Sequence, residues 1–174
     1  KTLEMANIVL VQTEAEARDL KDTYNVDFKW VKVPNGVGET FLNINPSELK
    51  NPLSIEDYII CVGRVEPRKN QLKVIEAVKI LRVELKKDLK LVLVGSSLGE
   101  KHFEYKWLFR KRLTENSWIT HVEKVPYEQM SSYYHFAKVG VSASWFETTG
   151  LTSLEALFCG TNAVASGERA HEYL

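Results

Sequence analysis

Two glutamates eight positions apart, Glu147 and Glu155, are the residues of this sequence best placed to do chemistry. The apolar stretch 139–144 predicts a strand, and the helix-favouring stretch 154–157 predicts a helix that Gly160 ends. The two carboxylates therefore lie on either side of a strand-to-helix junction.

The loop and the helix start between these glutamates add a second chemical group. The first amides of a helix lack partners within it and carry a partial positive charge, so they attract anions. Here they belong to Gly150, Leu151 and Thr152. Phosphate-binding amides between two sugar-binding carboxylates suit a nucleotide sugar. The alternative is structural: Thr152 and Glu155 have the spacing of a capping box, in which Glu155 binds only the helix end.

A basic loop forms a second candidate cluster. Gly63, Arg64 and Lys69 directly follow a predicted strand that ends at Val62. Glycine lets the backbone approach a ligand, arginine offers a planar fork to phosphate oxygens, and lysine offers a mobile charge. The alternative is a solvated basic loop that caps the next helix. Arg68 is expected to be exposed and receives no role.

The elements that position these residues follow from the hydrophobic pattern. Unbroken apolar runs alternate with segments of helical period, which indicates a parallel sheet covered on both faces. The predicted strands are 8–11, 28–33, 58–63, 89–95, 118–122, 139–144 and 163–166, and the predicted helices include 14–24, 103–113, 127–137 and one with Leu72, Ile75, Val78, Leu81 and Leu85 on one face. Right-handed crossovers then give an α/β, Rossmann-like, doubly wound domain.

Composition excludes several classes of protein. The chain has 174 residues, 44% hydrophobic and 26% charged, with formal net charge zero, so nothing indicates binding to nucleic acid or to an acidic membrane. Cys61 and Cys159 lie in apolar patterns and are expected to be free thiols in a reducing, cytoplasmic compartment. The chain contains no Asp-x-Asp pair, no phosphate loop with Gly-Lys-Ser/Thr and no Gly-x-Gly-x-x-Gly fingerprint. We therefore expect no metal site and no cofactor.

The order of these motifs resembles retaining glycosyltransferases with the GT-B fold, which carry an E-x7-E signature. The resemblance covers about residues 8–166. Two positions depart from the family pattern: Thr149 stands where Phe is usual, and Asn162 where Pro is usual.

The resemblance implies roles for individual residues. Glu147 would contact the donor sugar, Glu155 the ribose, and the amides of 150–152 the distal phosphate. Arg64 and Lys69 would neutralise the charge that grows on the leaving diphosphate, with Gly63 close by. Backbone groups near Val125 and Tyr127 would line the base pocket.

The resemblance also divides the chain. Residues 1–45 would be the tail of an amino-terminal domain with the interdomain linker, whose turn-rich part is 43–52. Residues 46–174 would be a nucleotide-sugar donor-binding domain truncated at its carboxyl end.

The expected partners are a nucleotide-sugar donor and a carbohydrate or lipid-linked acceptor, the latter bound through the missing amino-terminal domain; membrane association is left open. Two other functions compete. A nucleotide-sugar epimerase of GT-B architecture needs further carboxylates and histidines in the missing half, and the Glu147/Glu155 pair argues against it. A non-catalytic nucleotide-binding module on the same fold is the other alternative.

Overall fold

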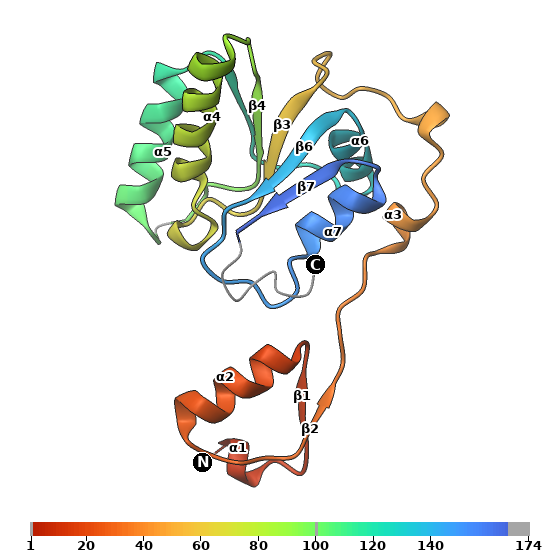
Figure 1. The fold of residues 1–174 in the computed structure, drawn as a ribbon, viewed down its shortest axis with the longest axis vertical. Helices are drawn as coiled ribbons and strands as arrows, with labels where there is room; N and C mark the ends of the chain where they lie inside the picture. Colours follow the sequence, from red (N-terminus) through yellow and green to blue (C-terminus); the bar gives the residue numbers. More distant parts are fainter. Residues whose placement is uncertain (1, 100, 167–174) are drawn as a thin grey trace.

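Five parallel strands form the centre of the structure, a computed structural model that describes residues 2–99 and 101–166 (Figure 1). Their order across the sheet is β5-β4-β3-β6-β7. The strands are β3 (Tyr58–Val62), β4 (Leu91–Val94), β5 (Ile119–Val122), β6 (Ala137–Ser142) and β7 (Asn162–Ala165). The chain crosses from β3 to β4 and β5 on one side, and from β6 to β7 on the other.

Helices cover both faces of this sheet (Figure 1). One face carries α4 (Gln71–Leu85) and α5 (Phe103–Glu115), and the other carries α6 (Met130–His135) and α7 (Leu151–Phe158). Short 3₁₀ turns precede two of them, η2 (Pro67–Lys69) before α4 and η3 (Tyr127–Gln129) before α6. The predicted doubly wound α/β fold is confirmed.

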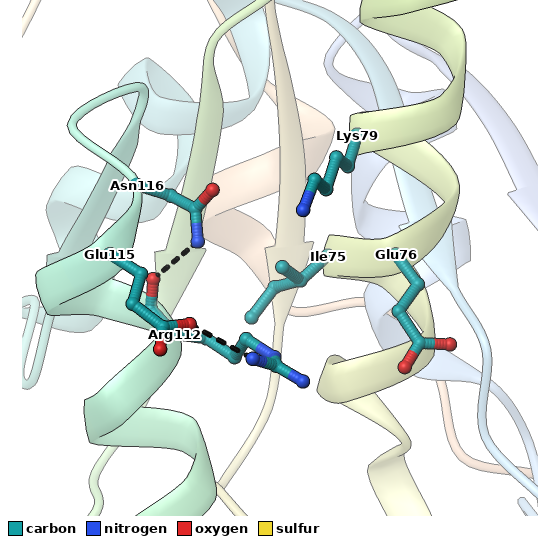
Figure 2. Close-up of a pocket in the computed structure, with 6 residues that line it drawn as sticks. All are labelled: Ile75, Glu76, Lys79, Arg112, Glu115 and Asn116. Carbon is teal, nitrogen blue, oxygen red and sulfur yellow. Dashed lines mark hydrogen bonds and ion pairs between the residues drawn. The ribbon is translucent and has the colours of Figure 1, made fainter.

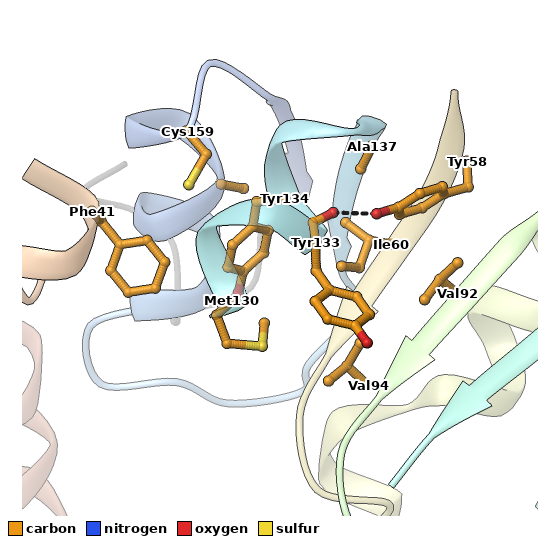
Figure 3. Packing of buried hydrophobic residues seen from close by; sticks show 11 residues of the cluster. Phe41, Tyr58, Ile60, Val92, Val94, Met130, Tyr133, Tyr134, Ala137 and Cys159 are labelled. Atoms are coloured by element: carbon orange, nitrogen blue, oxygen red, sulfur yellow. Dashed lines mark hydrogen bonds between the residues drawn. The ribbon is translucent and has the colours of Figure 1, made fainter. Parts of the chain in front are cut away.

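Alternation along the strands builds two cores. In β3, Tyr58 and Ile60 face α6 and α7, whereas Ile59 and Cys61 face α4 and α5. Figure 3 shows the first of these cores, in which the Tyr58 hydroxyl donates a hydrogen bond of 2.6 Å to the Tyr133 carbonyl. Because successive side chains of a strand point to opposite faces, a continuous apolar run can fill both cores.

The first part of the chain forms a separate, smaller unit. It contains α1 (Thr2–Met5), β1 (Val9–Val11), α2 (Glu14–Tyr24) and β2 (Trp30–Lys32), with β1 and β2 paired in parallel. A linker with α3 (Glu39–Leu42) and η1 (Pro46–Glu48) leads into the five-stranded sheet. Phe41 of this linker is fully buried against Tyr134. The proposed domain boundary at residues 45/46 stays a prediction, and residues 167–174 of the second domain lie outside the described residues.

Two helices leave some of their apolar side chains exposed. Leu81 and Leu85 of α4 are 38% and 53% exposed, because a 15-residue helix is longer than the five-residue strand beneath it and its last turns extend past the sheet. In α5, Phe109 is buried but Phe103 and Trp107 are exposed. Trp107 and Phe109 lie two residues apart, which places them on opposite sides of a helix.

The predicted boundaries of α6 and β6 also shift. The segment predicted as one helix over 127–137 is a 3₁₀ turn followed by the short α6, and Ala137 already belongs to β6. The strand then ends at Ser142 rather than Ser144, which lengthens the loop that carries Glu147.

The carboxyl ends of β3 and β4 approach each other at two glycines. Gly63 has φ 151° and Gly95 has φ 144°, and a Cβ built on Gly95 would lie 2.2 Å from the Gly63 carbonyl oxygen. Only glycine fits this contact without a backbone shift. Gly95 therefore permits the loop after β4 to lie directly against the loop after β3.

We expect Gly95→Ala to lower the free energy of unfolding by roughly 1–3 kcal/mol, from the clash and the unfavourable φ. Urea unfolding followed by circular dichroism measures this. Gly36→Ala is the control, since no atom lies within 4 Å of a Cβ built there, and it should change stability by less than about 0.5 kcal/mol. Equal effects of the two substitutions would contradict the close approach.

Candidate functional site

The two loops that carry the predicted site residues follow the two central strands. Residues 63–70 follow β3 and residues 143–150 follow β6, and β3 and β6 are neighbours in the sheet. The chain leaves them towards opposite sides of the sheet, so this is its topological switch point. Open α/β sheets bind ligands in the crevice at such a point, beyond the carboxyl ends of the strands.

Charged side chains join these loops. The Lys69 ammonium donates a hydrogen bond to Glu147 Oε1, and both side chains are only 14% exposed. Arg68 Nη1 lies 3.2 Å from the same oxygen and donates to the Phe146 carbonyl at 2.7 Å. The backbone adds a bond of 2.9 Å from the Trp145 amide to the Arg68 carbonyl. The structure thus brings Lys69 and Glu147 together as predicted, and adds Arg68, which the sequence analysis left out.

The environment of Glu147 favours its ionised form. Burial raises the pKa of this carboxyl, but hydrogen bonds from Lys69 and Ser144, with the charges of Lys69 and Arg68, outweigh burial and lower the pKa below its ordinary value of 4.5. Glu147 is therefore a carboxylate held between two cations, at the crevice mouth.

Helix α7 begins without a side-chain cap. Gly150, with φ 65°, precedes the helix, and its carbonyl accepts the bonds from Ser153 and Leu154. Among the described residues, the amides of Leu151 and Thr152 have no hydrogen-bond partner. These are the donors that the sequence predicted for a phosphate group.

Glu155 is not part of a capping box. Its Oε2 accepts a hydrogen bond of 2.9 Å from the Tyr134 hydroxyl of α6, and α7 starts at Leu151, not after Thr152. A comparable motif occurs instead at α2, where Glu16 accepts from the Gln12 amide at 2.7 Å and donates its own amide to Thr13 at 3.1 Å. Burial raises the pKa of Glu155, and the Tyr134 bond only partly opposes this.

Buried polar side chains fix the basic loop from below. The Gln71 side chain is 2% exposed and donates to the Arg64 carbonyl at 2.8 Å and the Gly63 carbonyl at 3.3 Å. Tyr105 of α5 in turn donates to Gln71 Oε1 at 3.1 Å. Nothing in the local sequence marks Gln71 or Tyr105, because their roles depend on the packing of α4 against α5.

The loop after β4 is fixed in the same way. Lys106, 6% exposed, donates to the carbonyls of Leu98 at 2.8 Å and Gly99 at 3.0 Å. His121 Nε2 lies 2.9 Å from the Gly95 carbonyl oxygen. Buried side chains therefore support both loops, after β3 and after β4, through hydrogen bonds to their backbone.

The remaining predicted residues make no contact with the Lys69–Glu147 pair that the structure shows among the described residues. Arg64 is exposed, and among the described residues its guanidinium has no partner. Val125 packs on the core beneath α6, and the Tyr127 ring contacts Phe41 with ring centroids 5.4 Å apart. The roles of Val125 and Tyr127 at the base stay predictions.

The loop after β6 also reaches the first unit of the chain. The Thr149 hydroxyl donates to Gln12 Oε1 at 2.7 Å, across 137 positions of sequence. Thr149 is one of the two positions that depart from the family pattern, and its hydroxyl supplies a contact that a phenylalanine could not make.

A second hollow lies between α4 and α5, away from this crevice (Figure 2). It lies at the carboxyl end of α5, where Arg112 pairs with Glu115 at 2.9 Å and Asn116 donates to the Arg112 carbonyl at 2.8 Å. Arg112 and Glu115 are two of its four charged lining residues, and it contains none of the predicted site residues.

No group of three or more metal-ligating side chains occurs in residues 2–99 and 101–166. In the same residues, no helix has the length and hydrophobicity needed to cross a bilayer.

Comparison with known proteins identifies the family. Residues 48–171 match the family described as glycosyl transferases group 1. The chain is 29% identical over 173 residues to D-inositol 3-phosphate glycosyltransferase of Arthrobacter sp. (strain FB24), covering 95% of this chain and 41% of the relative. It is 26% identical over 172 residues to O-antigen chain mannosyltransferase B of Escherichia coli, covering 95% of this chain and 45% of the relative. The chain thus spans less than half the length of these curated relatives.

Solved structures share the fold. Sucrose-phosphate synthase from Thermosynechococcus elongatus aligns with a TM-score of 0.75 and 24% identity, over 95% of this chain and 42% of that one. The pneumococcal O-GlcNAc transferase in complex with UDP and GlcNAc aligns with a TM-score of 0.70 and 20% identity, over 96% of this chain and 31% of that one. The predicted Rossmann-like half of a GT-B glycosyltransferase is confirmed.

The opposite pKa shifts of the two glutamates predict opposite pH effects. The lowered pKa of Glu147 gives stability that is present above pH 4.5 and lost as pH falls through the folded-state pKa. Glu147→Gln should therefore lose most stability relative to wild type at neutral pH, and less in acid. The raised pKa of Glu155 gives stability that is present below pH 4.5 and lost as pH rises through the folded-state pKa. The free energy of unfolding of Glu155→Gln should accordingly increase relative to that of the wild type as pH rises.

Urea unfolding of the three proteins between about pH 3.5 and 7 measures both differences. Glu48→Gln is a suitable control, because Glu48 is exposed and lies in η1, outside the loops that carry Lys69 and Glu147. Parallel stability curves for wild type and both variants would contradict the environments described here.

Proposed function

The chain belongs to the glycosyl transferases group 1 family, and from this membership we propose that it is the donor-binding part of a retaining, metal-independent glycosyltransferase. The enzyme transfers a hexose from a nucleotide-diphosphate sugar to a carbohydrate or lipid-linked acceptor. The observation that carries the proposal is the Lys69–Glu147 pair, which joins the loops after the neighbouring strands β3 and β6 and precedes the uncapped start of α7 in the second loop.

Each group in the crevice has one task. The Leu151 and Thr152 amides and the Lys69 ammonium bind the diphosphate, and the unpaired Arg64 guanidinium adds a planar fork. Glu155 binds the ribose through the carboxylate that Tyr134 orients. Glu147 binds hydroxyl groups of the sugar.

The chemical step depends on charge. The bond between the anomeric carbon and the diphosphate oxygen breaks, its electron pair goes to that oxygen, and Arg64 and Lys69 neutralise the negative charge that develops. The acceptor hydroxyl bonds to the same face of the anomeric carbon and gives its proton to the departing phosphate oxygen. Arg68 stays paired with Glu147 during this step, and the Glu147 carboxylate positions the sugar.

The acceptor site belongs to another part of the protein. The β1–β2 unit exposes apolar side chains, with Leu10 66% and Val31 45% exposed. Parallel strands normally have both faces covered, so these exposed side chains support the assignment of residues 1–45 to an acceptor-binding domain and linker.

Isothermal titration calorimetry with UDP, GDP and ADP tests the donor site. We expect one of them to bind, and Arg64→Ala and Glu155→Ala to weaken that binding roughly tenfold or more, because each removes a charged hydrogen-bonding group. UDP is the first choice, since the pneumococcal relative is a complex with UDP.

Lys79→Ala is the control, because Lys79 is exposed on α4 beside the hollow of Figure 2. Nucleotide affinity that neither Arg64→Ala nor Glu155→Ala changes would favour a non-catalytic module that uses other residues. Absence of binding to all three nucleotides would overturn the donor site itself.

A turnover assay tests the division of labour. The chain by itself should bind nucleotide weakly and transfer no hexose, because the acceptor-binding groups are assigned to a domain of which residues 1–45 are only the tail. The assay follows release of nucleoside diphosphate from UDP-glucose, GDP-mannose and ADP-glucose with simple sugar acceptors. Transfer above the background of a Glu147→Gln variant would show that assignment to be wrong.

A further inference from the structure

Arg68 makes more contacts across the crevice than any predicted site residue. Its guanidinium bonds Glu66 Oε1 through Nε at 3.2 Å and Nη2 at 2.9 Å, which fixes the plane of the group. This leaves Nη1 directed at the Phe146 carbonyl and at Glu147 Oε1. The Arg68 carbonyl also accepts from the Trp145 amide. Arg68 thus connects the loop after β3 to the loop after β6 through both its backbone and its side chain.

Lys69 and Arg68 differ in what they can do when a donor arrives. In the proposed function, Lys69 must bind the diphosphate, yet in the structure its ammonium pairs with Glu147. A flexible ammonium with three donors can turn towards a new anion, whereas the Arg68 fork is held by Glu66. When Lys69 turns, Arg68 is the cation that stays on Glu147.

We propose that Arg68 is a positioning residue for donor binding: it holds the Glu147 loop in place and stays paired with the Glu147 carboxylate after Lys69 engages the diphosphate. The proposal deepens the proposed function and rests on it. Arg68 itself touches neither the diphosphate nor the sugar.

Arginine is required at this position for a geometric reason. The guanidinium bonds Glu66 through Nε and Nη2 and the Phe146 carbonyl through Nη1. A lysine has a single ammonium nitrogen, which could pair with Glu66 or with Glu147 but could not replace all three nitrogens. In its affinity for the hexose conjugate, Arg68→Lys should therefore resemble Arg68→Ala more than it resembles the wild type, although lysine keeps the positive charge.

Two measurements on the same variants test the role. Carbon-13 NMR titration of the glutamate carboxyls gives the Glu147 pKa, which should rise in Arg68→Ala. Calorimetry compares each nucleotide with its hexose conjugate, using UDP with UDP-glucose, GDP with GDP-mannose and ADP with ADP-glucose. The affinity that the hexose adds should fall roughly tenfold in Arg68→Ala and Arg68→Lys, with the affinity for the nucleotide nearly unchanged.

Arg112→Ala is a matched control. The Arg112 side chain is 40% exposed, close to the 42% of Arg68, and it pairs with a glutamate at the same 2.9 Å. It lies beside the hollow between α4 and α5 (Figure 2), so neither the Glu147 pKa nor any affinity should change. If Arg68→Ala fails to fold, Arg68→Lys carries the test.

The other outcomes separate the two proposals. Equal losses of nucleotide and conjugate affinity would make Arg68 a phosphate ligand and overturn the positioning role, as would unchanged values of both readouts. If the wild type binds no nucleotide, the proposed function fails. In that case the NMR titration still tests the contact between Arg68 and Glu147. A Glu147 pKa that is unchanged in Arg68→Ala would contradict this contact.

Discussion

The order of the strands is the constraint on which the crevice depends. β3 and β6 lie side by side although 80 positions separate Ile59 from its partner Val139, and the chain leaves the two strands towards opposite sides of the sheet. Helices that cross to opposite faces cannot cover the space beyond these two strand ends, so that space stays open to a ligand. The close approach of Gly63 and Gly95 packs the loop after β4 against the loop after β3. The position of the crevice thus follows from topology before any side chain is considered.

Charge then distinguishes the two glutamates of the motif. Both are partly buried, and burial raises the pKa of each. Two cations from the neighbouring loop, with Ser144, reverse this effect at Glu147, whereas within the described part of the chain the Glu155 carboxyl accepts a hydrogen bond from the Tyr134 hydroxyl alone. The same residue type, eight positions apart, therefore serves as a fixed anion in one place and as a carboxyl of raised pKa in the other. This difference suits the separate tasks proposed for them.

Local pattern predicted most of the fold and the centre of the site. Unbroken apolar runs located every strand of the central sheet, and the pairing of Lys69 with Glu147 agrees with their predicted place at one edge. Arg68, Gln71 and Tyr134 were missed because each acts through a partner on another element. Their own neighbours in sequence contain no sign of those partners. The exposed ends of α4 were missed for a similar reason, since helix length relative to the sheet is a tertiary property.

The contacts of the Glu147 loop also explain why the free crevice is already ordered. A carboxylate placed beside unpaired helix amides could fold back onto them and occupy the place of the phosphate. The bonds from Lys69 and Arg68 draw Glu147 towards the loop after β3 instead, so the Leu151 and Thr152 amides stay free. In the proposed function, a diphosphate replaces Glu147 as the anion on Lys69 and meets amides that need not break existing bonds. The proposed phosphate site is then open before the donor binds, and the diphosphate competes with Glu147 for Lys69.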